Sequence, residues 1–520
     1  MSTAVCSTSP PTTAAPAPFA AARRAVVDVG HLMRFRAGTL RRRSMTLWLA
    51  AGLLVLTGSM AVVPAFLPGA GSGDGRALGL LLLLPTALSG FLALTVVSAA
   101  ASGGGRELLA RDPAAVHPIS PTTDHLGALL LAPLNIAWLV QAWALLGMTA
   151  YALGPNSYLV GAQLIVLAWL VTATAVAQLL AWIVEGARRI PRGVVAVRAV
   201  TVGLLGAALG LQMSGQLLTA FDRLPTRWIV LGMVDEFGAR WFVTAGGLAI
   251  CFLLAVALGA VPAGIAAHRI PHDELSVESD THTARSLPRS ALAGLVRTDR
   301  ASVWRAVPMR RGIAILAIGP GLVAILGNLP WNAITILPGL VASGGALLFG
   351  VNAWCLDGRG GLWRESLPVE PSTVFAARAW VLTEFLLVAS ALTIALAAIR
   401  AGVPTISEAT AILCTVLVVT VQVVAAAMRW SSQSPYAVDL RSARATPAPP
   451  MSMVAYSTRL AISTTLTAMV FSGLARVPAW QVSVLVAVPF LCWSGVRLLR
   501  TRRVWMDPVE RARIVTTVAV

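Results

Sequence analysis

A series of long apolar segments, separated by short polar ones, is the feature that most limits what this chain can fold into. An α-helix needs about 20 apolar residues to cross the hydrocarbon core of a bilayer. Because a helix satisfies its backbone hydrogen bonds within one segment, we assign helices rather than strands to these segments. The candidate spans are 45–66, 77–101, 125–150, 159–184, 194–220, 241–267, 312–328, 333–356, 379–399, 407–428, 454–474 and 479–496.

The composition agrees with a lipid-embedded protein. Of the 520 residues, 57% are hydrophobic and only 12% are charged, and the mean hydropathy is +0.77. Soluble domains carry about 25% charged residues. The net charge of +18 does not indicate nucleic acid binding, because the basic residues cluster at the ends of apolar spans.

The distribution of arginine predicts the orientation. The chain has no lysine, so all 40 basic residues are arginine. Cytoplasmic loops of membrane proteins are enriched in basic residues. With the N-terminus inside, all arginines face the cytoplasm except Arg76, Arg223, Arg227, Arg240, Arg400 and Arg476. We therefore expect both termini to be cytoplasmic.

A polar segment in the middle of the chain divides the spans into two groups of six. We expect a disordered N-terminal tail (1–30), a first half (31–267), a cytoplasmic linker (268–294), a second half (295–500) and a cytoplasmic C-terminal tail (501–520). The predicted fold class is an all-α polytopic membrane protein, with about 12 transmembrane helices arranged as two pseudo-symmetric six-helix halves.

Each half begins with a basic segment that also carries apolar residues, 31–43 and 295–305. Apolar and basic residues alternating at helical spacing are typical of a helix that lies in the membrane interface. The residues that predict these interfacial helices are Arg34, Arg36, Arg41, Arg297, Arg300, Trp304 and Arg305.

Two polar loops, 103–124 and 357–373, occupy matching positions after the second span of each half. Both contain Gly-Gly, then Arg-Glu, then Pro-x-x-Pro, and the first loop has eight more residues between the last two elements. Proline stiffens a loop by restricting φ, so a partner could push against it. The alternative is an ordinary connection with proline as a helix stop, but the recurrence favours docking. The candidate docking residues are Arg106, Glu107, Arg111, Asp112, Pro118, Ser120, Pro121, Arg364, Glu365, Pro368, Glu370 and Pro371.

A few polar residues interrupt the spans. They either line a substrate route or form hydrogen bonds between helices, which contribute about 0.6 kcal/mol each. Glu384 is the only carboxylate deep in a predicted span, where a charge usually has a function. The candidates are Asn135, Gln141, Gln178, Gln212, Gln216, Asn352, Glu384 and Gln422.

No enzyme signature occurs in the sequence. Without lysine there is no G-x-x-x-x-G-K-[ST] phosphate-binding loop. The five cysteines are scattered singly, and the spacing of His268, His272 and His282 fits no metal-ligand pattern. We therefore predict no catalytic, cofactor or metal site. The longest external segment, 220–241, either re-enters the outer leaflet or packs on the bundle.

The order of a basic amphipathic helix, two spans, a proline-containing loop and four more spans resembles the permease subunit of an ABC transporter of the type-2 exporter class. Two six-span units are fused here, as in similar permeases of actinobacterial drug or polyketide exporters. The residues that carry the resemblance are Arg-Glu-Leu-Leu at 106–109 and His-Pro-Ile-Ser-Pro at 117–121.

The resemblance implies an exporter in the cytoplasmic membrane of a bacterium, surrounded by membrane lipid. Two copies of a separate ATPase subunit would bind ATP and Mg²⁺ and dock on the two loops. The implied substrate is a hydrophobic or amphipathic small molecule. Two alternatives remain, an ion-driven twelve-span secondary transporter and a membrane scaffold that transports nothing.

Overall fold

The computed structural model describes residues 18–38, 43–73, 75–101, 119–134, 136–268, 286, 288–348, 350–358, 360–437 and 448–519. These residues form helices and turns, and none of them forms a strand. The prediction of an all-α polytopic membrane protein is confirmed. Helices of the first half are α1 (Pro18–Gly38), α2 (Arg43–Val62), η1 (Val63–Phe66), α3 (Gly75–Ala101), α5 (Pro121–Leu131), η2 (Ala132–Leu134), α6 (Ile136–Leu153), α7 (Tyr158–Arg188), α8 (Gly193–Met213), α9 (Leu217–Asp222), α10 (Thr226–Met233) and α11 (Ala239–Ala267).

The second half has a corresponding series. Its helices are α13 (Ala291–Arg305), α14 (Val307–Leu326), α15 (Trp331–Ile334), α16 (Leu337–Leu348), η3 (Gly350–Leu356), α17 (Gly360–Glu365), α18 (Pro371–Ala401), α19 (Ile406–Gln433), α20 (Pro450–Leu474), α21 (Trp480–Met506) and α22 (Pro508–Ala519).

Within the described residues, 9 helical segments are long and apolar enough to cross a membrane. They are α3, α7, α8, α11, α14, the segment from α15 to α16, α18, α19 and α21. Each falls on one of the predicted spans. The other three predicted spans correspond to α2, α6 and α20, and shorter apolar stretches lie at Ala50–Phe66 and Trp138–Leu153.

Several predicted spans are not continuous helices. They are interrupted at a proline, at a glycine or at a residue with a non-helical backbone. The third span is split between α5 and α6 by a 3-10 turn that contains Pro133. The eighth is split into α15, α16 and η3, and Asn352 there has a non-helical backbone. After α8 the chain turns at Gly215, whose φ of +70° favours glycine.

Both predicted tails contain helix. Helix α1 begins at Pro18, inside the segment expected to be disordered. Its apolar side packs on α5, where Val29 lies against Leu131. The C-terminal segment forms the end of α21 and the whole of α22. Residues 1–17 lie outside the described residues.

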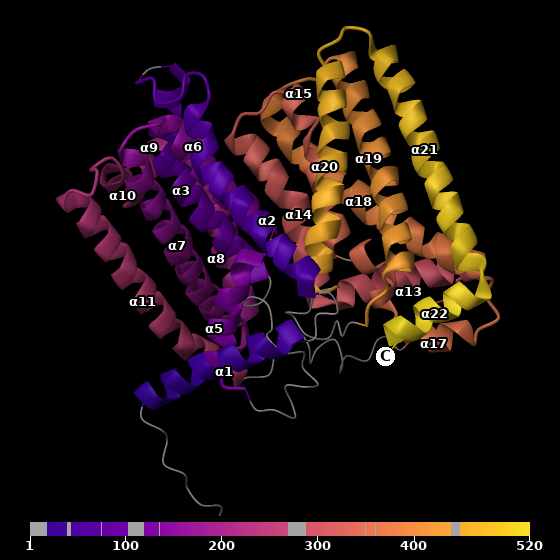
Figure 1. The fold of residues 1–520 in the computed structure, drawn as a ribbon. Helices are drawn as coiled ribbons and strands as arrows, with labels where there is room; N and C mark the ends of the chain where they lie inside the picture. Colours follow the sequence, from indigo (N-terminus) through magenta and orange to yellow (C-terminus); the bar gives the residue numbers. More distant parts are fainter. Residues whose placement is uncertain are drawn as a thin grey trace, which may run out of the picture.

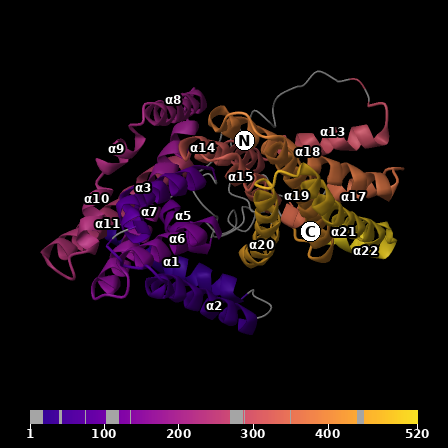
Figure 2. The same ribbon diagram turned by 90° about the horizontal axis from the view of Figure 1, so that it is seen from above.

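The two halves form two groups of helices side by side, with the first half on the left in Figure 1 and the second on the right. The view from above keeps the groups apart (Figure 2). Helices α1, α13, α17 and α22 lie together at one end of the molecule, which we call the α17 end (Figure 1). Helices α9, α10 and α15 lie at the opposite end, the α10 end (Figure 1).

Some helices that correspond in chain order pack in corresponding pairs, but the fifth helices of the two halves differ: α20 packs on α16 and α19, whereas α8 packs on α7 and α9. In the first half α1 packs on α5, α2 on α6, α3 on α7 and α7 on α11. In the second half α13 and α14 pack on α18, η3 and α16 on α19, and α19 on α21. The agreement covers the first four spans and the last span of each half, and not the fifth.

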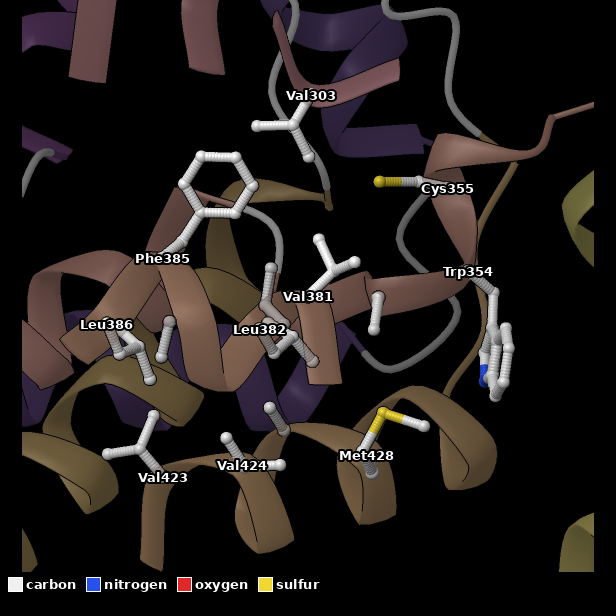
Figure 3. Packing of buried hydrophobic residues seen from close by; sticks show 14 of the residues in the cluster. Val303, Trp354, Cys355, Val381, Leu382, Phe385, Leu386, Val423, Val424 and Met428 are labelled. Carbon is white, nitrogen blue, oxygen red and sulfur yellow. The ribbon is translucent and has the colours of Figure 1, made fainter. Parts of the chain in front are cut away.

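The largest apolar core lies in the second half, between α13, η3, α18 and α19 (Figure 3). In Figure 3, Leu382 and Leu386 of α18 lie toward Val423, Val424 and Met428 of α19, whereas Val381 and Phe385 point toward Val303 of α13. The first half has its own core around α7, in which Ile165 and Val166 are fully buried.

Two polar contacts join the halves close to helix α14. Glu185 of α7 lies 3.5 Å from Arg311 of α14, measured from Oε2 to Nη1. Gln212 of α8 donates a hydrogen bond of 2.5 Å to the carbonyl oxygen of Leu326. The side chain of Glu185 is only 4% exposed and also lies near Arg188 and Arg189, so it sits in a cluster of three arginines.

The segment 220–241, predicted to be external, packs on the bundle. Its helix α10 contacts α3, α7 and α11, and Ile229 and Met233 are buried. Thr226 forms a hydrogen bond of 2.9 Å with Ser89 of α3. These contacts favour the second of the two alternatives for this segment.

A close approach of α5 and α11 supplies a test of this packing. A Cβ added to Gly259 of α11 would lie 2.4 Å from the buried ring of His125, so we expect Gly259→Ala to force the helices apart. Overpacking of this kind costs about 1–3 kcal/mol. The melting temperature of the purified protein should therefore fall.

Gly246→Ala in the same helix is the control, because a Cβ there meets nothing within 4 Å. Its melting temperature should be unchanged or slightly raised, since alanine is the better helix former. Equal melting temperatures for the two variants would contradict the described contact between α5 and α11.

Candidate functional site

The second proline-containing loop is the part of the predicted docking region that the structure describes. It leaves η3 at Asp357, forms the short helix α17 and enters α18 at Pro371. Pro371 occupies the first turn of α18, where its missing N–H costs no helical hydrogen bond. The loop lies at the α17 end, beside α13 and α22 (Figure 1).

A buried arginine ties this loop to the two neighbouring helices. Arg378 of α18 is fully buried, and its Nε and Nη2 donate to the two carboxylate oxygens of Asp299 of α13 at 2.8 and 3.0 Å. Nη2 also donates to Asp357 at 2.7 Å, and Nη1 donates to the carbonyl oxygen of Ala353. Arg364 of α17 pairs with the other oxygen of Asp357 at 2.5 Å.

These four side chains form a closed group whose charges cancel. Two arginines face two carboxylates, so no net charge is left in a poorly solvated place. A planar guanidinium can serve both carboxylates and a carbonyl at once, which an ammonium could not do with the same geometry. Because removal of one partner leaves buried charges uncompensated, each member is needed.

A pair of stacked tryptophans supports the ion group. The rings of Trp354 and Trp505 are nearly parallel, at 8°, with centroids 3.8 Å apart. The guanidinium carbons of Arg378 and Arg364 lie 5.4 and 5.7 Å from the Trp354 ring centroid, within reach of a cation–π interaction. Trp505 donates a hydrogen bond of 2.9 Å to the carbonyl oxygen of Pro371, which joins the end of α21 to the start of α18.

Helix α22 holds the inner face of α17. Gly361 is buried, and a Cβ there would lie 3.5 Å from Val515 of α22. Arg511 of α22 donates to Glu365 at 2.9 Å. On one face, therefore, α17 is fixed to the rest of the second half.

The opposite face of α17 carries large apolar side chains that the described chain leaves uncovered. Trp363 and Leu362 of α17 are 79% and 50% exposed, and Leu367, which follows the helix, is 53% exposed. An exposed apolar patch of this kind is typical of a site that contacts another protein or the membrane.

The structure separates the predicted docking residues of this loop into two groups. Arg364 and Glu365 form ion pairs within the chain, with Asp357 and Arg511. Pro368 and Glu370 are exposed, and Glu370 accepts a hydrogen bond of 3.1 Å from Ser372. The interacting surface that we infer is therefore more apolar than the sequence suggested.

The first loop is described only where it enters α5. Ser120 caps this helix by accepting a hydrogen bond of 3.0 Å from the backbone N–H of Thr123, and Pro121 opens its first turn. Both Pro-x-x-Pro motifs thus end in a proline that begins a helix. The predicted docking residues that lie outside the described residues are Arg106, Glu107, Arg111, Asp112 and Pro118.

The two segments predicted to be interfacial form helices, α1 and α13. Arg34 is exposed on α1, Arg36 belongs to the same helix, and Arg41 lies outside the described residues. On α13, Arg297 donates to the carbonyl oxygen of Ser286 at 3.0 Å, and Arg305 is exposed. Trp304 packs edge-on against Phe385 of α18, with ring centroids 5.8 Å apart.

Glu384, expected deep in a span, is paired with a helix at the α17 end. Its Oε2 accepts from Arg300 of α13, whose Nη2 lies 2.6 Å away. Its side chain is 34% exposed. Because α18 extends beyond the predicted span at its N-terminal end, Glu384 can reach the level of α13.

The other polar residues of the spans are distributed over different helices. Gln178 is buried, Gln141 is partly buried, and Gln216 is exposed between α8 and α9. Asn352 donates to the carbonyl oxygen of Tyr436 at 2.8 Å. Gln422 accepts from Thr467 at 3.2 Å and lines a cavity described below. Asn135 lies outside the described residues.

Sequence reasoning missed the ion group itself. Arg378 was counted only among the inner arginines, although an arginine seven residues into a long apolar helix is a signal of a buried partner. Its partners are 79 and 21 residues away in the chain, at Asp299 and Asp357. No local pattern connects these positions.

Replacing the central arginine tests the role of the ion group. Arg378→Met removes the charge with similar volume and leaves Asp299 and Asp357 buried without their partner. We expect a loss of about 3–5 kcal/mol in stability. A lower melting temperature and faster proteolysis between residues 357 and 371 would measure it.

Arg400→Met is the matched control, since Arg400 is exposed at the other end of the same helix. It should leave both measurements unchanged. If Arg378→Met behaved like the control, the ion group could not be what holds the loop.

The site thus consists of a short helix with an exposed apolar face, fixed by a neutral ion group and a tryptophan stack. No family model, curated protein or solved structure matches the chain.

Proposed function

We propose that this chain is the membrane-spanning permease subunit of an ATP-driven ABC exporter, powered by a separate ATPase subunit. The observation that carries the proposal is α17, which exposes Trp363 on one face and is fixed to the chain on the other. A partner that binds such a helix can transmit a force through it.

The contacts of α17 indicate how a force applied by a bound ATPase would pass to the other helices. From Asp357 it passes through Arg378 into α18, and through Asp299 into α13. From Glu365 and Val515 it passes into α22, which is joined to α21. A displacement of α17 would therefore move several helices of the second half together.

The matching order and packing of helices support a second docking position on the first half. Its counterpart is the loop that enters α5 at Pro121. Because α5, like α17, lies at the end where α1 and α22 gather (Figure 1), two ATPase copies could engage both loops from one side. The arginine distribution favours the cytoplasm for that side.

The implied partners and ligands follow from this scheme. ATP and Mg²⁺ belong to the ATPase copies, whose closure on nucleotide shifts the bundle from inward-open to outward-open. The substrate is a hydrophobic or amphipathic small molecule exported across the cytoplasmic membrane of a bacterium. Contacts between the halves at Glu185 and Arg311 lie where such a shift would act.

The acidic residues of the helices are paired with other groups of the chain, which disfavours the alternative of an ion-driven transporter. A proton relay requires acidic groups that can exchange protons along a path. Among the described residues, Glu185 and Glu384 are each paired with arginine, and Glu408 caps α19 together with Thr405. The alternative of a scaffold without transport activity predicts no effect of α17 variants on transport.

A single substitution on α17 tests the proposal. Trp363→Ala removes the most exposed apolar group of the loop without touching its ion pairs. Tryptophan at the centre of an interface typically contributes 2 kcal/mol or more, so affinity for the ATPase should fall about thirtyfold. Co-purification with the ATPase from membranes and substrate-stimulated ATP hydrolysis would measure the effect.

Trp228→Ala serves as the control, because Trp228 is 74% exposed on α10 at the opposite end. It should bind the ATPase like the unmodified chain. Unchanged co-purification of the Trp363→Ala protein would count against docking at α17. Transport that survives removal of the ATPase but stops with a protonophore would replace the ABC scheme by the ion-driven one.

A further inference from the structure

A cavity of about 280 Å³ lies between α19, α20 and α21 near the α17 end, away from the docking loop. Three arginines line it, one from each helix: Arg429, Arg459 and Arg497. The wall between them includes Gln422, Gln433, Trp430, Tyr456 and Ser463, and no acidic residue is among the lining residues.

The positive charges of this cavity are not compensated by the part of the chain that the structure describes. Within that part, none of the three arginines forms an ion pair or a hydrogen bond. Instead, the charges of Arg429 and Arg459 repel that of Arg497. Three cations held together near a membrane span are costly unless an anion joins them.

Hydrogen-bond donors without acceptors point to the same conclusion. The Nε of Arg497, the Nε1 of Trp430 and the hydroxyl of Tyr456 are buried without a hydrogen-bond partner. Tyr456 is only 2% exposed, and its ring lies against that of Trp430, with centroids 5.3 Å apart. A buried donor without an acceptor costs about 1–3 kcal/mol, so such groups usually have a ligand.

Apolar surface continues from the arginines toward the middle of the membrane. On α20, Ile462 and Leu466 follow Arg459 by three and seven residues, so they share its face, and they are 57% and 60% exposed. On α21, Trp493 precedes Arg497 by four residues and is 65% exposed. A molecule with its oxyanion in the cavity would lay an apolar body along these side chains.

We propose that this cavity binds the oxyanion of an amphipathic anion, a phosphate or carboxylate carried on an apolar body. Arg429, Arg459 and Arg497 bind the oxyanion by charge-assisted hydrogen bonds, and Tyr456 and Trp430 donate to it. Two sources share this chemistry, an anionic membrane lipid and a transported solute. The second source rests on the proposed transport function, whereas binding itself does not.

Binding of dodecyl phosphate to the full chain in a neutral detergent tests the site. The unmodified chain should bind this probe and gain thermal stability. Arg497→Gln and Arg459→Gln should each weaken binding at least about tenfold, because a hydrogen bond to a charged group is lost. Inorganic phosphate, which has no apolar body, should bind more weakly than dodecyl phosphate.

Arg500→Gln is the matched control, since Arg500 is exposed one turn further along α21 and does not line the cavity. It removes the same charge and should leave binding within about twofold of the unmodified chain, as expected for a surface charge. In the absence of the probe, Arg497→Gln should not lower the melting temperature, because it relieves the repulsion between arginines.

Three results would overturn the proposal. One is equal loss of binding in Arg500→Gln and Arg497→Gln, which would indicate nonspecific attraction. Another is destabilisation of the probe-free protein by Arg497→Gln, which would indicate that its charge has a partner within the chain. The third is equal affinity for inorganic and dodecyl phosphate, which would show that the apolar part of the ligand does not contribute to binding.

Mass spectrometry of the intact protein purified from membranes separates the two sources. A retained anionic phospholipid that is absent from the Arg459→Gln/Arg497→Gln double variant would identify lipid. If no lipid is retained while dodecyl phosphate competes with transport, the solute is the source. Both results support the site, and neither depends on ATPase docking at α17.

Discussion

The second half depends on the neutralisation of one buried arginine. Arg378 would be too costly in its place if Asp299 and Asp357 did not contact it at hydrogen-bond distance. Since these carboxylates come from α13 and from the loop after η3, the electrostatic requirement of one side chain determines where three segments lie. The stacked rings of Trp354 and Trp505 lie beside the same group, and both side chains are buried.

In the first half, the contact of the opening helix α1 is of a different kind. Helix α1 packs on α5 through Val29, Leu32 and Leu131, which are apolar. Helix α13 packs on α18 through apolar side chains such as Trp304 and Phe385 and, in addition, through the ion pair of Asp299 and Arg378. Apolar packing tolerates sliding more readily than a bidentate ion pair does, because dispersion has no preferred direction and guanidinium–carboxylate geometry has one. The contact between α13 and α18 is therefore more directional than the contact between α1 and α5.

The positions of the apolar spans could be predicted from the sequence, because the length of an apolar segment decides whether it can cross a bilayer. The sequence did not locate the helix starts at Pro121 and Pro371, because the apolar segments alone place these spans at 125–150 and 379–399. It was insufficient for the breaks near Pro133 and Asn352, where proline and a non-helical backbone interrupt an otherwise apolar run. It could not reveal which charges meet, because Arg378, Asp299 and Asp357 are brought together by the fold. The same holds for Arg429, Arg459 and Arg497, which stand on three different helices and share no motif.

The prolines that begin α5 and α18 have a consequence for how the chain tolerates insertions and deletions. The two loops differ by eight residues, and the whole difference lies before Pro118 and Pro368. Residues added upstream of a helix start lengthen the connection but leave the rotation of every later side chain about the helix axis unchanged. Residues added downstream would turn α18 by about 100° each and carry Arg378 away from its carboxylates. The chain can therefore vary in length on one side of these prolines and not on the other.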